Sequence, residues 1–414
     1  MSNSNGEIEQ SELWDIARRL ISFDTVSAST NVPAAAYLAD YLDALSFTVH
    51  LVTERVHDVE KAMVVAWAGP AEPGGLILSG HIDVVPFAGQ PGWTTDPLTL
   101  QSDGQQLFGR GVSDMKVFLA QTLVAAKRSP LKNLKRPLMY IFTCDEEVAG
   151  QGSARLVSKF PHLLKGYPLP EVALIGEPTN FEIFPAQKGY ATFDIIVHGK
   201  GGHSSVPNRG VNAIEKMAEV IWLMQEMNGA LQQRISPENR RLFPEYPASS
   251  LNCGLISGGL ATNMIAETCQ LAASVRVSPG DSIEEIVAEL REKIENGVAK
   301  RLREAVESGN VSLENVQAVP PMRSPLDNAF CRFLSRVVGK SVERGAAFAT
   351  DGGNFQQLGI NSYICGPGLL EQAHQPNESL PVAHFFSGLD YLERVIYEWC
   401  IKENQADLSA GSDR

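Results

Sequence analysis

Apolar residues along the chain follow two patterns, one typical of helices and one typical of strands. In Ser11–Leu20 and again in Ala34–Leu45 they recur every three or four positions, which predicts two amphipathic helices. Leu76–Leu78 and Leu138–Phe142 are short continuous apolar runs, as in strands buried on both faces of a parallel sheet. A helix is predicted between these runs, over Val117–Ala126, so strand and helix alternate and an α/β layered domain is expected.

The pattern changes near Gly189, where strands begin to alternate apolar and polar residues. In chain order the sequence predicts a strand over Thr192–His198, a helix over Val211–Met227, a strand over Leu271–Val277, a helix over Ile283–Val306 and a strand over Val311–Val319. We therefore predict a discontinuous catalytic α/β domain, residues 1–188 and 318–414, with a mostly parallel mixed sheet. An α+β domain, residues 189–317, is inserted into it.

Composition narrows the class of protein. The 414 residues suit about two domains, and 44% hydrophobic with 20% charged residues indicates a globular chain. A net charge of −13 argues against binding to nucleic acid or to an anionic membrane. Met1–Gln10 has no apolar core of a secretory signal, and the six cysteines form no CxxC pair, so a reducing cytoplasm is expected.

Side chains able to bind metal ions follow the predicted strands or lie in adjoining loops. They are His81, Asp83, Asp114, the acidic run Asp145–Glu147, Glu177 and His374. Taken singly, each has a plain structural interpretation, such as a surface histidine, a helix N-cap or a solvated acidic loop. Together, two histidines and several carboxylates at one edge of a sheet favour a pair of divalent ions, Zn²⁺ or Co²⁺, with Mn²⁺ also possible.

Six segments carry a resemblance to a known family. They are GHIDVVP from Gly80, GRGVSDMK from Gly109, DEEVAGQGS from Asp145, GEPT from Gly176, KGGHSS from Lys200 and EQAHQPNE from Glu371. In order and spacing they resemble the metallohydrolase family that contains acetylornithine deacetylase, succinyl-diaminopimelate desuccinylase, aminoacylase and glutamate carboxypeptidases. The likeness runs from about Leu13 to Cys400. It implies a metal-dependent hydrolase of linear amides, in which the inserted, ferredoxin-like domain is a lid and a homodimer interface.

The resemblance also implies roles for individual residues. One metal ion would be held by His81, Asp114 and Glu177, and the other by Asp114, Glu147 and His374, with Asp114 bridging. Glu146 would be the general base, and Asp83 would orient His81. In the inserted domain, His203 would stabilise the oxyanion in the partner subunit's site, and Arg276, with Asn263 as a weaker candidate, would bind the substrate carboxylate. Without the family, His203 reads as a hairpin-turn histidine and Arg276 as a surface arginine.

Within the family, further motifs resemble the acetylornithine deacetylase branch, among them GWTTDP from Gly92 and NRGVNAIE from Asn208. This likeness implies hydrolysis of Nα-acetyl-L-ornithine to ornithine and acetate, in arginine biosynthesis. Thr350-Asp351-Gly352 departs from that branch and is closer to the Ser-Asp-Gly of desuccinylases. Asp351 is expected near the substrate side chain, where it would face an ammonium group. The alternatives are a succinylated diamino acid, another N-acyl amino acid, a dipeptide, or a non-enzymatic binding protein on the same fold.

Overall fold

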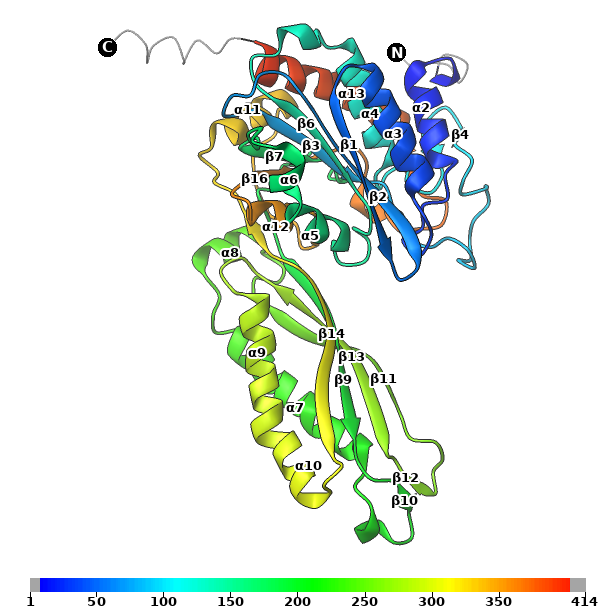
Figure 1. Ribbon diagram of the computed structural model, residues 1–414, viewed down its shortest axis with the longest axis vertical. Coiled ribbons are helices and arrows are strands. Elements are labelled where there is room, and N and C mark those ends of the chain that lie inside the picture. Colours follow the sequence, from blue (N-terminus) through cyan, green and yellow to red (C-terminus); the bar gives the residue numbers. More distant parts are fainter. Residues whose placement is uncertain (1–7, 403–414) are drawn as a thin grey trace, which may run out of the picture. The chain divides into compact units, whose positions relative to one another are not determined.

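The computed structural model describes residues 8–402 and divides the chain into two compact units (Figure 1). The first unit contains the chain up to Pro185, Arg323–Glu343 and the chain from Thr350 onward. The second contains Ala186–Met322 and Arg344–Ala349. Residues 1–7, which form most of the stretch searched for a secretory signal, lie outside the described range.

The first unit is built on a six-stranded mixed sheet of order β1-β2-β6-β3-β7-β16. Its strands are β1 Thr48–Val56, β2 Val59–Ala68, β3 Leu76–His81, β6 Leu138–Thr143, β7 Val172–Ile175 and β16 Asn361–Ile364. The four strands from β6 to β16 are parallel, whereas β1 and β2 are antiparallel to their neighbours. The predicted α/β fold with a mostly parallel mixed sheet is confirmed.

Helices cover both faces of this sheet (Figure 1). They are α2 Glu12–Ile21, α3 Val32–Ala44, α4 Lys116–Arg128, α5 Gln151–Val157, α6 Phe160–Leu164, α11 Ala329–Val338, α12 Gly352–Gln356 and α13 Val382–Ile396. Every residue of β3 and β6 is buried, as their continuous apolar runs predict. A small three-stranded sheet adds β4 Gln101–Ser102, β5 Gln106–Phe108 and β17 Ser379–Pro381.

The second unit has a four-stranded antiparallel sheet of order β11-β13-β9-β14. Its main elements are β9 Gly189–His198, α7 Ala213–Leu231, β11 Ser250–Gly258, β13 Thr268–Val277, α9 Ile283–Ile294, α10 Lys300–Ala305 and β14 Asn310–Val319. The order strand–helix–strand–strand–helix–strand, with this arrangement of strands, is that of a ferredoxin-like fold. Both α7 and α9 pack on the sheet and on each other.

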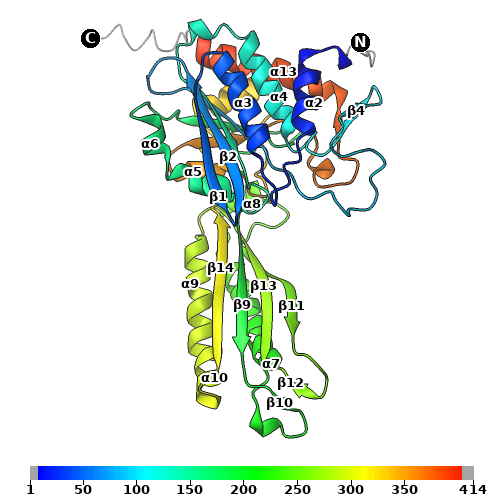
Figure 2. The ribbon, with the colours of Figure 1, turned by 45° about the vertical axis from the view of Figure 1, so that its right-hand side comes forward.

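Short elements complete the second unit. They are α8 Pro237–Leu242, β8 Ala186–Gln187, β10 Gly202–His203 and β12 Met264–Ile265. The boundary between the two units falls within β15 Met322–Arg323. β10 pairs with β12 beyond one end of the sheet (Figure 2). The predicted helix over residues 283–306 is found as α9 and α10, joined by a π-helical turn.

Two features of the fold differ from the sequence prediction. Arg344–Ala349, assigned by sequence to the catalytic domain, belongs to the second unit because Ala346 exchanges backbone hydrogen bonds with Ala186 and Lys188 at 2.8 and 3.0 Å. The edge strand β11 is absent from the prediction, because seven of its nine residues are exposed and no apolar alternation marks it. Within residues 8–402, no helix is both long and apolar enough to cross a membrane.

Candidate functional site

The carboxyl ends of three adjacent parallel strands, β6, β3 and β7, meet at one edge of the first unit's sheet. His81 is the last residue of β3, Glu146 and Glu147 follow β6, and Glu177 follows β7. Open α/β sheets bind ligands at this edge, because the loops after parallel strands converge there.

Two groups of side chains in the described part of the chain could each hold a metal ion, and they share Asp114. One group is His81, Asp114 and Glu177, and the other is Asp114, Glu147 and His374. Within each group the ligand atoms all lie within 4.8 Å of one another. These are the two sets of residues that the resemblance implies.

Asp114 presents one carboxylate oxygen to each histidine. Its Oδ1 lies 3.0 Å from His81 Nε2, and its Oδ2 lies 3.3 Å from His374 Nε2. His374 Nε2 also lies 3.0 Å from Glu147 Oε2, and His81 Nε2 lies 4.0 Å from Glu177 Oε2. The His81 side chain is 1% exposed, whereas that of His374 is 52% exposed, so the second group is the one open to solvent.

The carboxylates of the site destabilise one another's charge. Burial raises the pKa of Glu146 well above its ordinary value, against the opposing charge of His81, and the charge of Glu177 raises it further. Burial and the charge of Asp114 likewise raise the pKa of Glu177 and of Glu147. Bound cations relieve this kind of repulsion.

The histidines compensate for part of that negative charge. Hydrogen bonds with Asp114 and Glu147 raise the pKa of His374 to about 10. Burial opposes the protonation of His81, but the hydrogen bond and charge of Asp114 outweigh it and raise the pKa of His81 well above its usual value. Protonation of the two imidazoles thus supplies positive charge that balances part of the negative charge of the carboxylates, as bound cations would.

Asp83 orients His81 through its backbone carbonyl, whereas its side chain was expected to do so. His81 Nδ1 donates to the backbone carbonyl of Asp83 at 2.9 Å, whereas the Asp83 carboxylate lies 3.9 Å away, beyond hydrogen-bonding distance. Because a carbonyl only accepts, Nδ1 carries a hydrogen, so Nε2 is the nitrogen that faces Asp114, to which the protonated ring donates a second hydrogen bond at 3.0 Å. The main chain of residue 83 therefore leaves Nε2 as the nitrogen that a metal ion could use.

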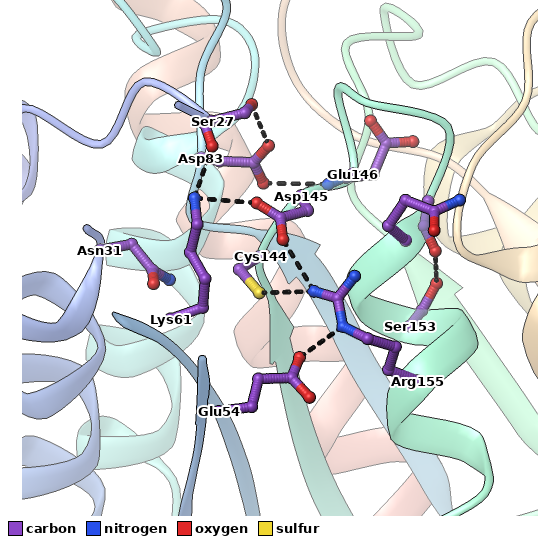
Figure 3. Close-up of polar contacts among 12 residues, drawn as sticks. Ser27, Asn31, Glu54, Lys61, Asp83, Cys144, Asp145, Glu146, Ser153 and Arg155 are labelled. Atoms are coloured by element: carbon purple, nitrogen blue, oxygen red, sulfur yellow. Dashed lines mark hydrogen bonds and ion pairs between the residues drawn. The ribbon is translucent and has the colours of Figure 1, made fainter. Parts of the chain in front are cut away.

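The Asp83 carboxylate holds the loop that carries the two glutamates (Figure 3). It accepts hydrogen bonds from the backbone N–H groups of Glu146 and Glu147, at 3.1 and 3.3 Å, and from the Ser27 hydroxyl at 2.7 Å. Asp83 is 1% exposed. It sets the position of the backbone from which both glutamate side chains project.

Asp145, the first member of the acidic run, belongs to a separate ion-pair network (Figure 3). Its carboxylate pairs with Lys61 at 3.0 Å and with Arg155 at 2.7 Å, and Arg155 also pairs with Glu54 at 2.6 Å. The acidic run is therefore divided. Asp145 is neutralised by two cations that the sequence analysis did not identify, and Glu146 and Glu147 remain near the metal-binding groups.

Asp351 is 2% exposed, and each of its carboxylate oxygens is bound by a hydroxyl group. Thr143 donates to Oδ2 at 2.6 Å, and Ser153 donates to Oδ1 at 2.5 Å. Thr143 ends β6 and Ser153 lies in α5, so Asp351 ties together both ends of the loop that contains Glu146. These contacts favour a supporting position over the expected contact with a substrate ammonium.

His203 and Asn263 lie side by side in the second unit. His203 pairs with Met264 across β10 and β12, and the Ser204 N–H donates to the carbonyl of Asn263 at 3.0 Å. The Ser205 N–H donates to His203 Nδ1 at 3.1 Å, so Nδ1 is the acceptor and the ring hydrogen of this exposed side chain is on Nε2. That N–H is a hydrogen-bond donor of the kind an oxyanion needs.

Arg276 lies at the other end of the same unit's sheet. It is opposite Tyr190 in the β13–β9 ladder, and its guanidinium stacks on the Tyr190 ring at 3.9 Å. Nearby, Lys188 is 4% exposed and donates to the carbonyls of Tyr246 and Ala248, at 2.6 and 2.7 Å. Burial and the charge of Arg276 lower the pKa of Lys188 to about 8. Arg276 and Lys188 therefore place two basic side chains at this end of the sheet.

The sequence model of Peptidase family M20/M25/M40 matches residues 77–398 of the chain. Several relatives that match nearly the whole chain are named acetylornithine deacetylase. The one from Erwinia tasmaniensis is 31% identical over 393 residues, covering 93% of this chain and 97% of its own. The one from Vibrio vulnificus is 32% identical over 395 residues, covering 93% of this chain and 98% of its own.

Solved structures with the same fold include a metallo-carboxypeptidase from Sulfolobus solfataricus, with a TM-score of 0.72 and 16% identity. It matches 93% of this chain and 98% of its own. A tripeptidase from Staphylococcus aureus has a TM-score of 0.71 and 20% identity, over 93% of this chain and 96% of its own. The chain is a metal-dependent hydrolase of amide bonds, and it belongs to Peptidase family M20/M25/M40.

Proposed function

We propose that this protein deacylates N-acyl amino acids, with Nα-acetyl-L-ornithine as its substrate and L-ornithine and acetate as its products. The observation that carries the proposal is the pair of metal-binding groups joined at Asp114, with Glu146 on the adjoining loop. The names of the relatives, 31–32% identical over 93% of the chain, support the substrate.

The donor set fits two divalent cations. Each group combines one imidazole with two carboxylates, and Asp114 has one oxygen directed to each group. Such mixed nitrogen and oxygen donors suit Zn²⁺ or Co²⁺, and also accept Mn²⁺. When bound, the ions would polarise the acyl oxygen and make a water molecule acidic.

Glu146 is the residue that we assign as general base. The Asp83 carboxylate fixes its main chain, and its raised pKa brings its proton affinity closer to that needed to accept and return a proton near neutral pH. In the proposed reaction Glu146 takes a proton from the attacking water and delivers it to the leaving nitrogen. The adjacent Glu147 instead lies 3.0 Å from His374.

The second unit would recognise substrate and act as a lid. Arg276 offers a planar guanidinium, stacked on Tyr190, that can bind an α-carboxylate through two parallel hydrogen bonds. Asn263, next to His203, is the weaker candidate for this role.

His203 and Arg276 of one chain are too far apart to contact the same small substrate. Arg276 and Thr268 lie near opposite ends of β13, a strand of 10 residues, and the β10–β12 pair that contains His203 lies beyond the Thr268 end. At ~3.4 Å per residue the strand alone is about 30 Å long. The separation supports a homodimer in which the partner's His203 completes each site.

Exposed apolar side chains of the second unit support the same dimer. Its edge strand β11 presents Leu255 and Ile256, which are 76% and 55% exposed, and α7 presents Trp222, which is 67% exposed. Soluble monomers rarely leave an unpaired strand edge with large apolar side chains uncovered. A second copy of the chain that paired with this edge would cover apolar side chains of β11.

The test is amine release by the purified protein loaded with Zn²⁺ or Co²⁺. Nα-acetyl-L-ornithine is compared with N-succinyl-L,L-diaminopimelate, with a chelator as control. Chelator-sensitive turnover of the acetyl compound supports the proposal. Turnover of the succinyl compound alone would reject it in favour of a desuccinylase, the alternative raised by the likeness of Thr350-Asp351-Gly352 to the desuccinylase motif. If neither compound reacts while metal is bound, the substrate assignment is wrong.

A further inference from the structure

A buried ion pair joins the two loops that carry Asp114 and His374. The Arg110 guanidinium lies 2.9 Å from the Glu378 carboxylate, and each side chain is 1% exposed. Arg110 is four residues before Asp114, and Glu378 is four residues after His374. Neither residue is in the proposed metal-binding groups or takes part in the proposed chemistry.

Glu378 binds the turn that presents Asp114. One of its carboxylate oxygens accepts hydrogen bonds from the backbone N–H groups of Ser113 and Asp114, at 2.8 and 2.9 Å. The other accepts from the Gly111 N–H at 3.0 Å and from Arg110. Four donors converge on one carboxylate, so the backbone of the Asp114 turn is fixed by a side chain from the His374 loop.

Arg110 and Gln90, which lie outside the His374 loop, donate hydrogen bonds that reach its backbone carbonyls. Arg110 Nη2 donates to Gln90 Oε1 at 2.7 Å, and Gln90 Nε2 donates to the carbonyl of His374 at 2.8 Å. Arg110 Nη1 lies 3.4 Å from the carbonyl of Gln375. Glu378 therefore binds the main chain at Asp114, and Arg110 is linked to the carbonyl of His374 through Gln90.

Stability alone does not explain a pair of this kind. Burying two charges carries a desolvation cost, and well-packed apolar residues of similar size often stabilise a protein as well or better. The specific feature here is the set of partners, which are backbone groups of two proposed metal ligands or of their immediate neighbours. Outer hydrogen bonds that orient ligands typically change metal affinity about 10- to 100-fold.

We propose that Glu378, Arg110 and Gln90 form a positioning clamp that sets the separation between Asp114 and His374 for the second metal ion. The inference rests on the proposed metal sites. It predicts that loosening the clamp weakens metal binding in a protein that is still folded, and it assigns a purpose to the final glutamate of the EQAHQPNE segment.

The experiment is a Zn²⁺ titration of the full-length, metal-free protein by calorimetry, with bound metal counted by elemental analysis. Glu378→Gln replaces one acceptor oxygen by an amide that cannot accept from the backbone N–H groups. Gln90→Leu removes the contact with His374 without leaving a buried charge unpaired. The matched control is Tyr363→Phe, which removes a buried hydrogen bond to the Pro325 carbonyl (2.7 Å) in the same unit.

We expect both clamp variants to bind one Zn²⁺ ion about 10- to 100-fold more weakly than the unmodified protein, and Tyr363→Phe to bind both ions unchanged. Unchanged affinity for both ions in the folded clamp variants would overturn the inference. If Glu378→Gln does not fold, Gln90→Leu alone decides. An unmodified protein that binds no Zn²⁺ would instead reject the proposed metal sites, so the two failures are distinguishable.

Discussion

At the scale of single residues, the site separates acidic side chains that are adjacent in sequence. Asp145 pairs with Lys61 and Arg155, whereas Glu146 and Glu147 lie near His81 and His374. This division follows from backbone geometry, since Asp145 has a positive φ of 54° and the chain turns sharply there. Adjacent carboxylates are thereby given different electrostatic surroundings and different uses.

Substitution of Glu146 tests the general base. We expect Glu146→Ala to lower kcat about 10²- to 10⁴-fold, the usual contribution of a positioned base, and to leave metal content unchanged. The measurements are steady-state turnover of Nα-acetyl-L-ornithine and the metal content of the same preparation. A variant with nearly normal kcat would reject the assignment, and loss of metal would show that Glu146 is a ligand.

Substitution of Arg276 tests the carboxylate contact. Because a charged hydrogen bond contributes ~1.5–3 kcal/mol, Arg276→Met is expected to lower kcat/KM about 10- to 100-fold. The control is a substrate whose α-carboxylate is replaced by a carboxamide. It should react poorly with the unmodified protein and equally poorly with the variant. Additive losses from the two changes would mean that Arg276 does not contact the carboxylate.

Residue roles were predictable from sequence only where a motif carried them. The metal-binding groups lie within motifs, and the structure brings those residues together. The contact of His81 with residue 83 uses a backbone carbonyl, which no residue type reveals. Lys61 lies 84 positions before Asp145, so no local pattern could associate them.

At the scale of elements, strands were predictable where burial imposed an apolar pattern. The fully buried β3 and β6 are continuous apolar runs, and both were predicted. β11 was missed because it lies at a sheet edge and its register shifts between Cys253 and Leu255, so its apolar residues do not alternate regularly. Edge strands are specified by their partner more than by their own sequence.

The loop between β6 and α5 depends on the ion pairs of Asp145. We expect Asp145→Asn to lower the free energy of unfolding by ~3–5 kcal/mol, because Lys61, 4% exposed, would lose its only paired carboxylate among the described contacts. Urea denaturation of the metal-free protein measures the change. The matched surface variant, Glu393→Gln, breaks the half-exposed pair with Arg128 and should cost less than ~1 kcal/mol. Equally small losses of unfolding free energy in the two variants would show that the buried pair contributes no more to stability than the surface pair.

At the scale of the whole molecule, the inserted unit gives the chain a second, separate core. Its ferredoxin-like sheet buries one face under α7 and α9, and β11 is an edge strand of this sheet. The proposed dimer follows from two independent features, namely the exposed apolar residues of this edge and the length of β13 between His203 and Arg276.

Mixing two inactive variants tests the proposed dimer directly. Glu146→Ala and His203→Ala should each be nearly inactive as homodimers, because every site lacks either the base or the oxyanion donor. After subunit exchange, a mixed dimer holds one complete site, in which the His203→Ala chain supplies Glu146 and its partner supplies His203. An equal mixture should then regain about a quarter of the wild-type sites, since half of the dimers are mixed and each has one complete site.

If His203 serves its own chain instead, no mixed dimer contains a complete site, and activity stays at the level of the separate variants. Exchange itself is checked by size-exclusion chromatography of differently tagged chains, so that an absence of recovery cannot be mistaken for an absence of mixing.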